Sequence, residues 1–219
     1  MDARELLRTA YGDLSGLLLA LDDDEAAQPT GCAGWAVLDL AQHLVADVRR
    51  GLVALATPAD PPATSDAVGY WRSWQQSAEE AADDRWRTRA AASLAGGVGV
   101  LAATYRETTD AVLVLAGRVS PGALVRTQGH VLRVDALLST LVVEACVHHL
   151  DLVERIDRPG PRRGPLGEVR RVVTELAGQP LPEDWDDATA ARRGTGREAL
   201  TPADRLALGT VVDRFPVFA

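Results

Sequence analysis

The segment from Val134 to Val153, VDALLSTLVVEACVHHLDLV, is apolar on nearly every side of a helix. A helix of this kind is enclosed by other helices rather than exposed along one face. It nevertheless contains Glu144, His148, His149 and Asp151. Because an unpaired carboxylate in a protein interior is energetically costly, the fold around this helix must supply compensating partners.

Amphipathic helices flank this segment. Apolar side chains at three- and four-residue spacings predict helices over residues 3–21, 37–52 and 165–178. The Ala-rich residues 67–92 and 98–117 are expected to form either one long helix interrupted at Gly96 and Gly97 or two helices. The proline-rich stretch 57–64 is predicted to be a connector, and ALVRTQGHVLRVD a short hairpin or an extended loop. A last helix is predicted to begin at Pro202, with Thr201 as its N-cap. Together these patterns predict a mainly α protein, an antiparallel four-helix bundle with one or more long connections.

The chain changes character at RIDRPGPRRGP, which is rich in proline, glycine and charge. We therefore expect two parts, a bundle in residues 1–155 and a small C-terminal extension in residues 156–219 that packs on it. Within the extension, the stretch LPEDWDD is expected to be a loop.

Composition and charge exclude several classes of protein. A hydrophobic content of 47% with 25% charged residues is that of a folded globular chain. The net charge of -8 repels phosphate backbones, so we expect no nucleic-acid partner. No apolar run is long enough to span a bilayer and the N-terminus does not resemble a signal peptide, so we expect a cytoplasmic protein with no membrane partner. In that compartment Cys32 and Cys146 are expected to be reduced thiols.

Glu144 and His148 are four residues apart, so on a helix they lie on one face with Cβ atoms about 5–6 Å from each other. His43, in the helix predicted from residue 37, borders the apolar stripe and can face the same interior. Neutral imidazole and carboxylate suit zinc or another divalent first-row metal, and three protein ligands leave one coordination position open. The pattern therefore indicates a catalytic metal site. The alternative is an ion pair between Glu144 and Arg126 or Arg133, with His148 as a hydrogen-bonded core histidine.

Other polar residues near these positions allow two interpretations each. Asp151 follows His148 by three residues, and we expect it to orient that imidazole or to bind substrate. Asp39 is expected to stabilise a helix N-terminus, and Trp35 to pack or to contact a ligand. His149 points about 100° away from His148, so it cannot serve the same centre and is expected at an interface or on the surface.

Two further groups carry weaker signals. Tyr70, Trp71 and Trp74 either line a pocket over the metal or form a packing cluster at a helix N-terminus, and we favour packing. Residues 195–197, Thr-Gly-Arg, are too short a motif to predict an anion site. Cys146 is expected to be a small core residue.

Two motifs together carry a resemblance. TGCAGWAVLDLAQHL, residues 30–44, resembles the T-x-C-x-G-W-x-V-x-D-L-x-x-H signature of the mycothiol-dependent maleylpyruvate isomerase family, a branch of the DinB-like four-helix bundles. The later VVEACVHHLDL is similar to the E-x-x-x-H-x-x-D element of that family. The resemblance covers about residues 1–155. The part that follows is shorter than the C-terminal domain of the isomerase itself, so the resemblance does not extend to its substrate.

The resemblance implies a metal, usually zinc, held by His43, Glu144 and His148, with mycothiol as the thiol co-substrate of an actinobacterial enzyme. The leading hypothesis is thus a thiol S-transferase or isomerase acting on a small electrophilic metabolite, in which metal stabilises the nucleophilic thiolate. A metal-dependent hydrolase is the second hypothesis. The third is a non-catalytic bundle that binds a small molecule or a protein partner. A homo-oligomer is compatible with all three.

Overall fold

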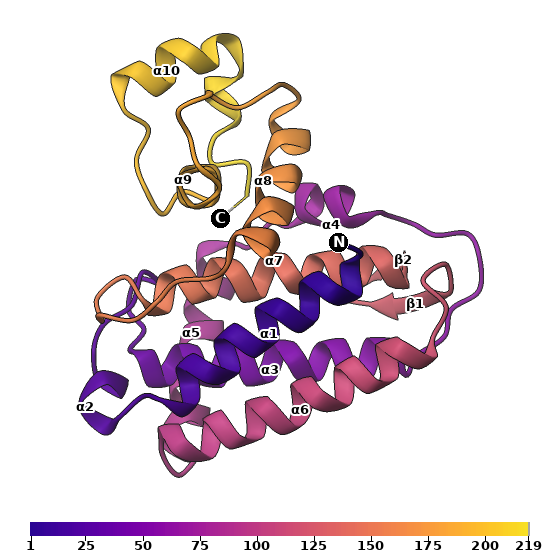
Figure 1. Cartoon of the computed structure of the whole chain (residues 1–219), viewed down its shortest axis with the longest axis vertical. Coiled ribbons are helices and arrows are strands. Elements are labelled where there is room, and N and C mark those ends of the chain that lie inside the picture. Colours follow the sequence, from indigo (N-terminus) through magenta and orange to yellow (C-terminus); the bar gives the residue numbers. More distant parts are fainter. Residues whose placement is uncertain (219) are drawn as a thin grey trace.

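The computed structural model describes residues 1–218, and four long helices form its bundle (Figure 1). These helices are α1 (Ala3–Leu19), α3 (Val37–Leu55), α6 (Val98–Arg118) and α7 (Val134–Leu152). Around the bundle α1 packs on α6 and α7, and α3 packs on the same two helices from the opposite side. The mainly α bundle predicted from the sequence is therefore confirmed.

The predicted antiparallel arrangement is only half right. The N-terminal part of α1 meets the end of α6, where Arg4 donates a hydrogen bond to the carbonyl of Val119, so these two helices are antiparallel. In contrast α3 and α6 run in the same direction, because both end at the hairpin that follows α6, where Ala59 N–H donates to the carbonyl of Leu124. The long connection between α3 and α6 makes this parallel pairing possible, since a short loop can join only antiparallel neighbours.

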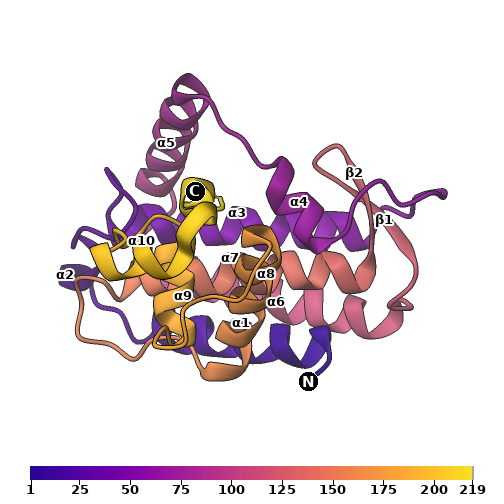
Figure 2. The same cartoon turned by 90° about the horizontal axis from the view of Figure 1, so that it is seen from above.

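Shorter elements fill the connections. They are α2 (Asp23–Ala26), α4 (Ala67–Ser73), α5 (Ala78–Ser93), and the strands β1 (Leu124–Thr127) and β2 (His130–Arg133). The strands pair antiparallel around the turn at Gln128 and Gly129, both with positive φ, as the sequence of this segment predicted. The segment from residue 67 to 118 forms three helices, α4, α5 and α6, because Trp74 and Gly97 adopt non-helical backbone angles. α5 projects from the bundle (Figure 2).

Helix α7 is enclosed on all sides. Sixteen of its 19 residues are buried, including His148, His149 and Asp151. Its neighbours are α1 and α3 within the bundle, and α4 and α8 outside it. No helix within residues 1–218 combines the length and apolarity needed to cross a membrane.

The extension consists of α8 (Arg163–Ala177), α9 (Asp187–Gly194), α10 (Pro202–Leu208) and a 3₁₀ helix, Gly209–Arg214. Helix α8 packs on α7 and α1, which joins the extension to the bundle core. Thr201 caps α10 as predicted. The loop predicted for LPEDWDD is confirmed except at its last residue, Asp187, where α9 begins. Helix α9 itself was missed, although Asp186 accepts a hydrogen bond from Thr189 N–H and so caps its N-terminus.

We expect Leu137→Ala in α7 to lower the free energy of unfolding by about 2–5 kcal/mol, because Leu137 is fully buried and the deletion leaves a cavity. Leu206→Ala in α10 is the control, since Leu206 is 85% exposed and should change stability by less than about 0.5 kcal/mol. Urea unfolding of both variants checks this, and equal losses would contradict the central position of α7.

Candidate metal centre

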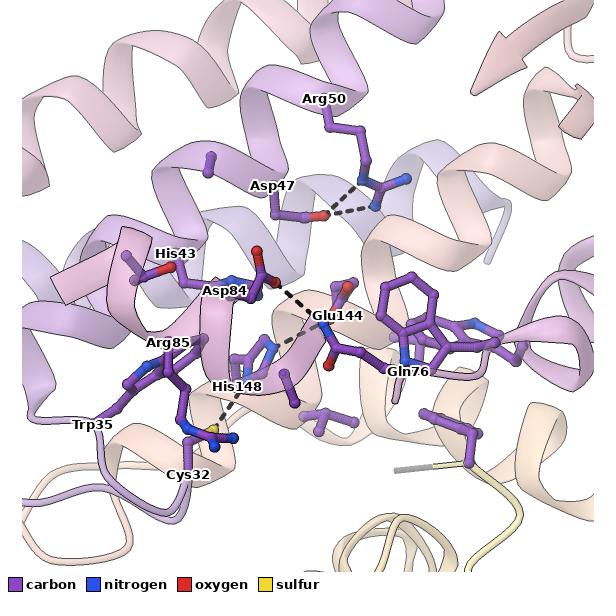
Figure 3. Close-up of a pocket in the computed structure, with 18 of the residues that line it drawn as sticks. Cys32, Trp35, His43, Asp47, Arg50, Gln76, Asp84, Arg85, Glu144 and His148 are labelled. Carbon is purple, nitrogen blue, oxygen red and sulfur yellow. Dashed lines mark hydrogen bonds and ion pairs between the residues drawn. The ribbon is translucent and has the colours of Figure 1, made fainter. Parts of the chain in front are cut away.

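Helices α3 and α7 bring His43, Glu144 and His148 to one point, as Figure 3 shows. One donor atom from each lies within 4.8 Å of the other two. His148 Nε2 is 3.3 Å from Glu144 Oε2, and the rings of His43 and His148 are 4.7 Å apart. Two ligand atoms of a tetrahedral zinc, each about 2.0–2.2 Å from the ion, lie about 3.4 Å apart. The spacing of this cluster therefore fits a metal ion.

Without a metal, the positive charge beside Glu144 is that of protonated His148: burial opposes this charge, but the hydrogen bonds to Asp151 and Glu144 raise the pKa of His148 well above its usual range. Burial, followed by the charge of His148, lowers the pKa of His43 to about 4, so His43 is a neutral imidazole near pH 7. Its Nε2 is enclosed and has no hydrogen-bond partner within residues 1–218. Burial would raise the pKa of Glu144, but the hydrogen bond and charge of His148 outweigh it and lower that pKa to about 2. The carboxylate of Glu144 and one ring nitrogen each of His43 and His148 thus face one another. The proton of His148 Nε2 satisfies Glu144, but His43 Nε2 still has no partner within residues 1–218.

Asp151 orients His148 through the ring nitrogen that does not face Glu144. His148 Nδ1 lies 3.0 Å from Asp151 Oδ2, so Nδ1 donates to Asp151 while Nε2 faces Glu144, where it can donate a proton or, after losing that proton, bind a metal. Asp151 in turn accepts hydrogen bonds from Arg197 Nε at 3.0 and 3.1 Å. Burial would raise the pKa of Asp151, yet the bonds to His148 and Arg197 hold it well below its usual range. Asp151 therefore keeps a proton on Nδ1 of His148, and Arg197 of the extension neutralises the charge of Asp151.

The loop before α3 completes this arrangement. Gly31 N–H donates to the carbonyl of Asp151 at 2.9 Å, and a Cβ on Gly31 would lie 2.6 Å from Asp151 Oδ1. This position therefore requires glycine, because the loop passes directly over the end of α7. Gly34, at φ +84°, supports the turn in which Trp35 N–H donates to the carbonyl of Cys32. The two glycines of TGCAGW thus place Cys32 and Trp35 against the cluster.

A second group with metal-binding atoms, Cys32, His148 and Asp151, shares one residue with the first. Cys32 Sγ is 3.1 Å from Asp151 Oδ2 and 3.7 Å from His148 Nδ1. Here the carboxylate is already paired with Arg197, whereas no arginine within residues 1–218 forms an ion pair with Glu144. Within this part of the chain Glu144 is paired only with His148, whose Nε2 can release its proton to bind a metal ion, so the first group is the better cation site.

A pocket of about 690 Å³ opens beside the cluster. Its volume is in the range of small-molecule sites in proteins. Among the residues lining it are Cys32, Trp35, His43, Asp47, Arg50, Trp71, Trp74, Gln76, Asp84, Arg85, Gln128, Glu144, His148, Arg197 and Phe218. The side chains come from α3, α4, α5, α7, the loops near them, and the extension. Ten of them are labelled in Figure 3.

The remaining candidates have mixed outcomes. Trp35 lines the pocket, 5.0 Å from the ring of His43, and Asp39 accepts a hydrogen bond from Ala36 N–H at the start of α3. The expectation for His149 was wrong. It is 2% exposed, and its Nε2 lies 3.0 Å from the carbonyl of Pro159, because the segment after α7 folds back over this side of the helix.

Two alternatives are also corrected. Glu144 does not pair with Arg126 or Arg133, since Arg126 is exposed and Arg133 binds Asp135 at 2.8 Å. Trp71 and Trp74 line the pocket as well as packing on each other, so the packing interpretation alone was wrong. Cys32 and Cys146 are both free cysteines, and Cys146 lies in the core as predicted.

Three residues of the site were missed by sequence reasoning. Arg197 was set aside because its motif is short, and nothing in the sequence links it to Asp151. Asp47 and Arg50 form a buried ion pair on the pocket wall, with Arg50 Nη2 2.6 Å from Asp47 Oδ1. Asp47 follows His43 by four residues, so its place on the same face of α3 was a usable signal.

The fold and the cluster define a helical bundle with a candidate metal centre in its core. Over residues 7–153 the chain matches the model of the mycothiol maleylpyruvate isomerase N-terminal domain, and it belongs to that family. The matched residues include the three residues of the cluster, whereas Arg197 and Phe218 lie beyond them. Searches of the curated proteins and of the solved structures found no match.

We expect Gly31→Ala to lower the free energy of unfolding by about 1–3 kcal/mol, because the added Cβ forces the loop away from Asp151. Gly12→Ala in α1 is the matched control. No atom lies within 4 Å of its added Cβ, and removing a helical glycine should stabilise by about 0.5–1 kcal/mol. Thermal unfolding of both variants checks this, and a neutral Gly31→Ala would contradict the close approach.

Proposed function

We propose that the chain is a metal-dependent enzyme that uses mycothiol, a low-molecular-weight thiol, for S-transfer to a small electrophilic metabolite or for its isomerisation. The family membership supports the thiol. The observation that carries the proposal is the cluster of His43, Glu144 and His148, in which an enclosed imidazole nitrogen lacks a partner beside an ionised carboxylate. In this proposal residues 1–155 form the metal-binding bundle and residues 156–219 the extension, in a cytoplasmic protein.

These three residues would hold the metal, and their donor atoms, two nitrogens and one oxygen, favour zinc. A divalent metal bound there supplies positive charge that stabilises a thiolate near neutral pH. The protein's own side chains set up the rest of the site. Asp151 keeps the Nδ1 proton of His148 in place, and Arg197 keeps Asp151 ionised. Because the pKa values of Asp151 and Glu144 are both low, neither carboxylate takes up the proton of the thiol at neutral pH.

The walls of the pocket supply binding and positioning. Trp35 lies against His43 and limits the directions from which a ligand reaches the cluster. On α5, Asp84 and Arg85 present polar groups to the pocket, as suits a hydrophilic thiol. The volume of about 690 Å³ leaves room for a second organic molecule beside the thiol's sulfur end.

We expect His43→Ala to fold, to lose bound zinc, and to lose stabilisation by mycothiol. Removing one of three ligands from a site with an open position should weaken zinc binding steeply. The wild type, which should carry about one zinc per chain, should gain about 2.7 kcal/mol of stability at a mycothiol concentration of 100 times Kd. Metal analysis and thermal unfolding on the same preparation measure both effects.

His130→Ala is the matched control, because His130 lies in the hairpin, with its Nε2 3.3 Å from the hydroxyl of Ser73, outside the cluster. It should keep both zinc and the mycothiol response. S-methylated mycothiol should give little stabilisation, since its sulfur cannot ionise. Retained zinc and retained thiol binding in His43→Ala would end the three-ligand proposal, and zinc binding without any thiol response would favour a metal hydrolase.

A further inference from the structure

One wall of the pocket is aromatic and is built from two distant segments. Trp71 and Trp74, at the end of α4, have ring centroids 6.3 Å apart. Phe218, from the C-terminal segment, stacks on Trp71 with centroids 4.5 Å apart and an interplanar angle of 24°. All three line the pocket, and we call them the aromatic wall. The volume of about 690 Å³ is that of the pocket with Phe218 in this place, so this side chain lines the space that remains.

Hydrogen-bond donors without acceptors accompany this wall. Asp47 Oδ1 accepts from Arg50 Nε at 3.0 Å and from Nη2 at 2.6 Å, which holds the guanidinium in one orientation. Arg50 Nη1 and the indole nitrogen of Trp71 are enclosed and have no partner within residues 1–218. Buried donors normally have an acceptor, so this part of the pocket is suited to a ligand that brings one.

The chemistry of both features specifies the ligand. Offset-stacked aromatic pairs attract a further flat ring more than a saturated ring of equal size. A carboxylate offers two acceptor oxygens and a negative charge, which form stronger hydrogen bonds to a guanidinium than a neutral amide does. A planar acid therefore uses the aromatic wall and Arg50 at once.

We propose that the aromatic wall and Arg50 form the subsite for the electrophile and that they select an aromatic carboxylate. The ring lies against the aromatic wall, and a carboxylate oxygen accepts a hydrogen bond from Arg50 Nη1 once this covered nitrogen shifts toward the pocket. Phe218 is then a specificity-determining residue contributed by the extension. The assignment of this ligand as the electrophile rests on the proposed function. The prediction that it binds here does not.

Calorimetric titration of the zinc-loaded protein with three unreactive probes tests the proposal. Benzoate is the planar acid, benzamide its neutral counterpart, and cyclohexanecarboxylate a saturated acid of similar size. We expect benzoate to bind at least about tenfold more tightly than benzamide, because the charge strengthens the hydrogen bonds. It should also bind about three- to tenfold more tightly than cyclohexanecarboxylate, because only benzoate stacks.

Phe218→Ala should abolish the preference of benzoate over cyclohexanecarboxylate. Phe215→Ala is the control, because Phe215 packs edge-on against Trp185 with centroids 6.0 Å apart and does not line the pocket. It should keep the preference of the wild type. Circular dichroism of both variants checks that they fold, and Phe218→Tyr, which keeps the ring, should retain the preference if Phe218→Ala does not fold.

Several results would overturn the proposal. Equal binding of the two acids to the wild type would show that only the carboxylate is recognised, by the metal or by Arg50. Tighter benzoate binding in Phe218→Ala would show that Phe218 occupies the place of the ligand. Because no thiol takes part, a failure here leaves thiol binding untouched, and the absence of thiol chemistry would not alter these affinities.

Discussion

The charge of Glu144 on an enclosed helix is the constraint on which the site depends. α7 packs against α1, α3, α4 and α8, so only the face of α7 that lines the pocket is open to water. Burial acts against ionisation of Glu144, yet the adjacent His148 keeps its pKa low. The enclosed Nε2 of His43 then faces the same point without a partner. In the proposed function, a divalent cation bound there would satisfy all three groups at once and would tie α3 to α7.

The two carboxylates of α7 are compensated in different ways. Asp151 is neutralised inside the protein by Arg197, which comes from the extension, while Glu144 has no arginine of its own within residues 1–218. The extension therefore orients His148 through Asp151, and it also supplies Phe218 to the pocket. Residues beyond the family-matched segment thus complete a site whose donor atoms all lie inside it.

Patterns that depend on neighbouring residues were predictable from the sequence. The enclosed helix α7, the turn at Gln128 and Gly129, and the cap of α10 at Thr201 each follow from a local signal. The convergence of His43 on Glu144 was also foreseeable, since both lie on apolar helix faces. The direction of α3 relative to α6 was not, because the long connection between them permits either. Arg197 lies 46 residues from Asp151 along the chain, and no local pattern specifies a pairing at that distance.

X-ray absorption at the zinc edge, recorded with and without mycothiol, distinguishes a metal-bound thiolate from the alternatives. We expect zinc ligands of nitrogen and oxygen at about 2.0–2.2 Å in the protein alone, and one sulfur at about 2.3 Å after mycothiol is added. Sulfur already present in the protein alone would indicate that Cys32, His148 and Asp151 hold the metal. No sulfur after saturation with mycothiol would contradict a metal-bound thiolate.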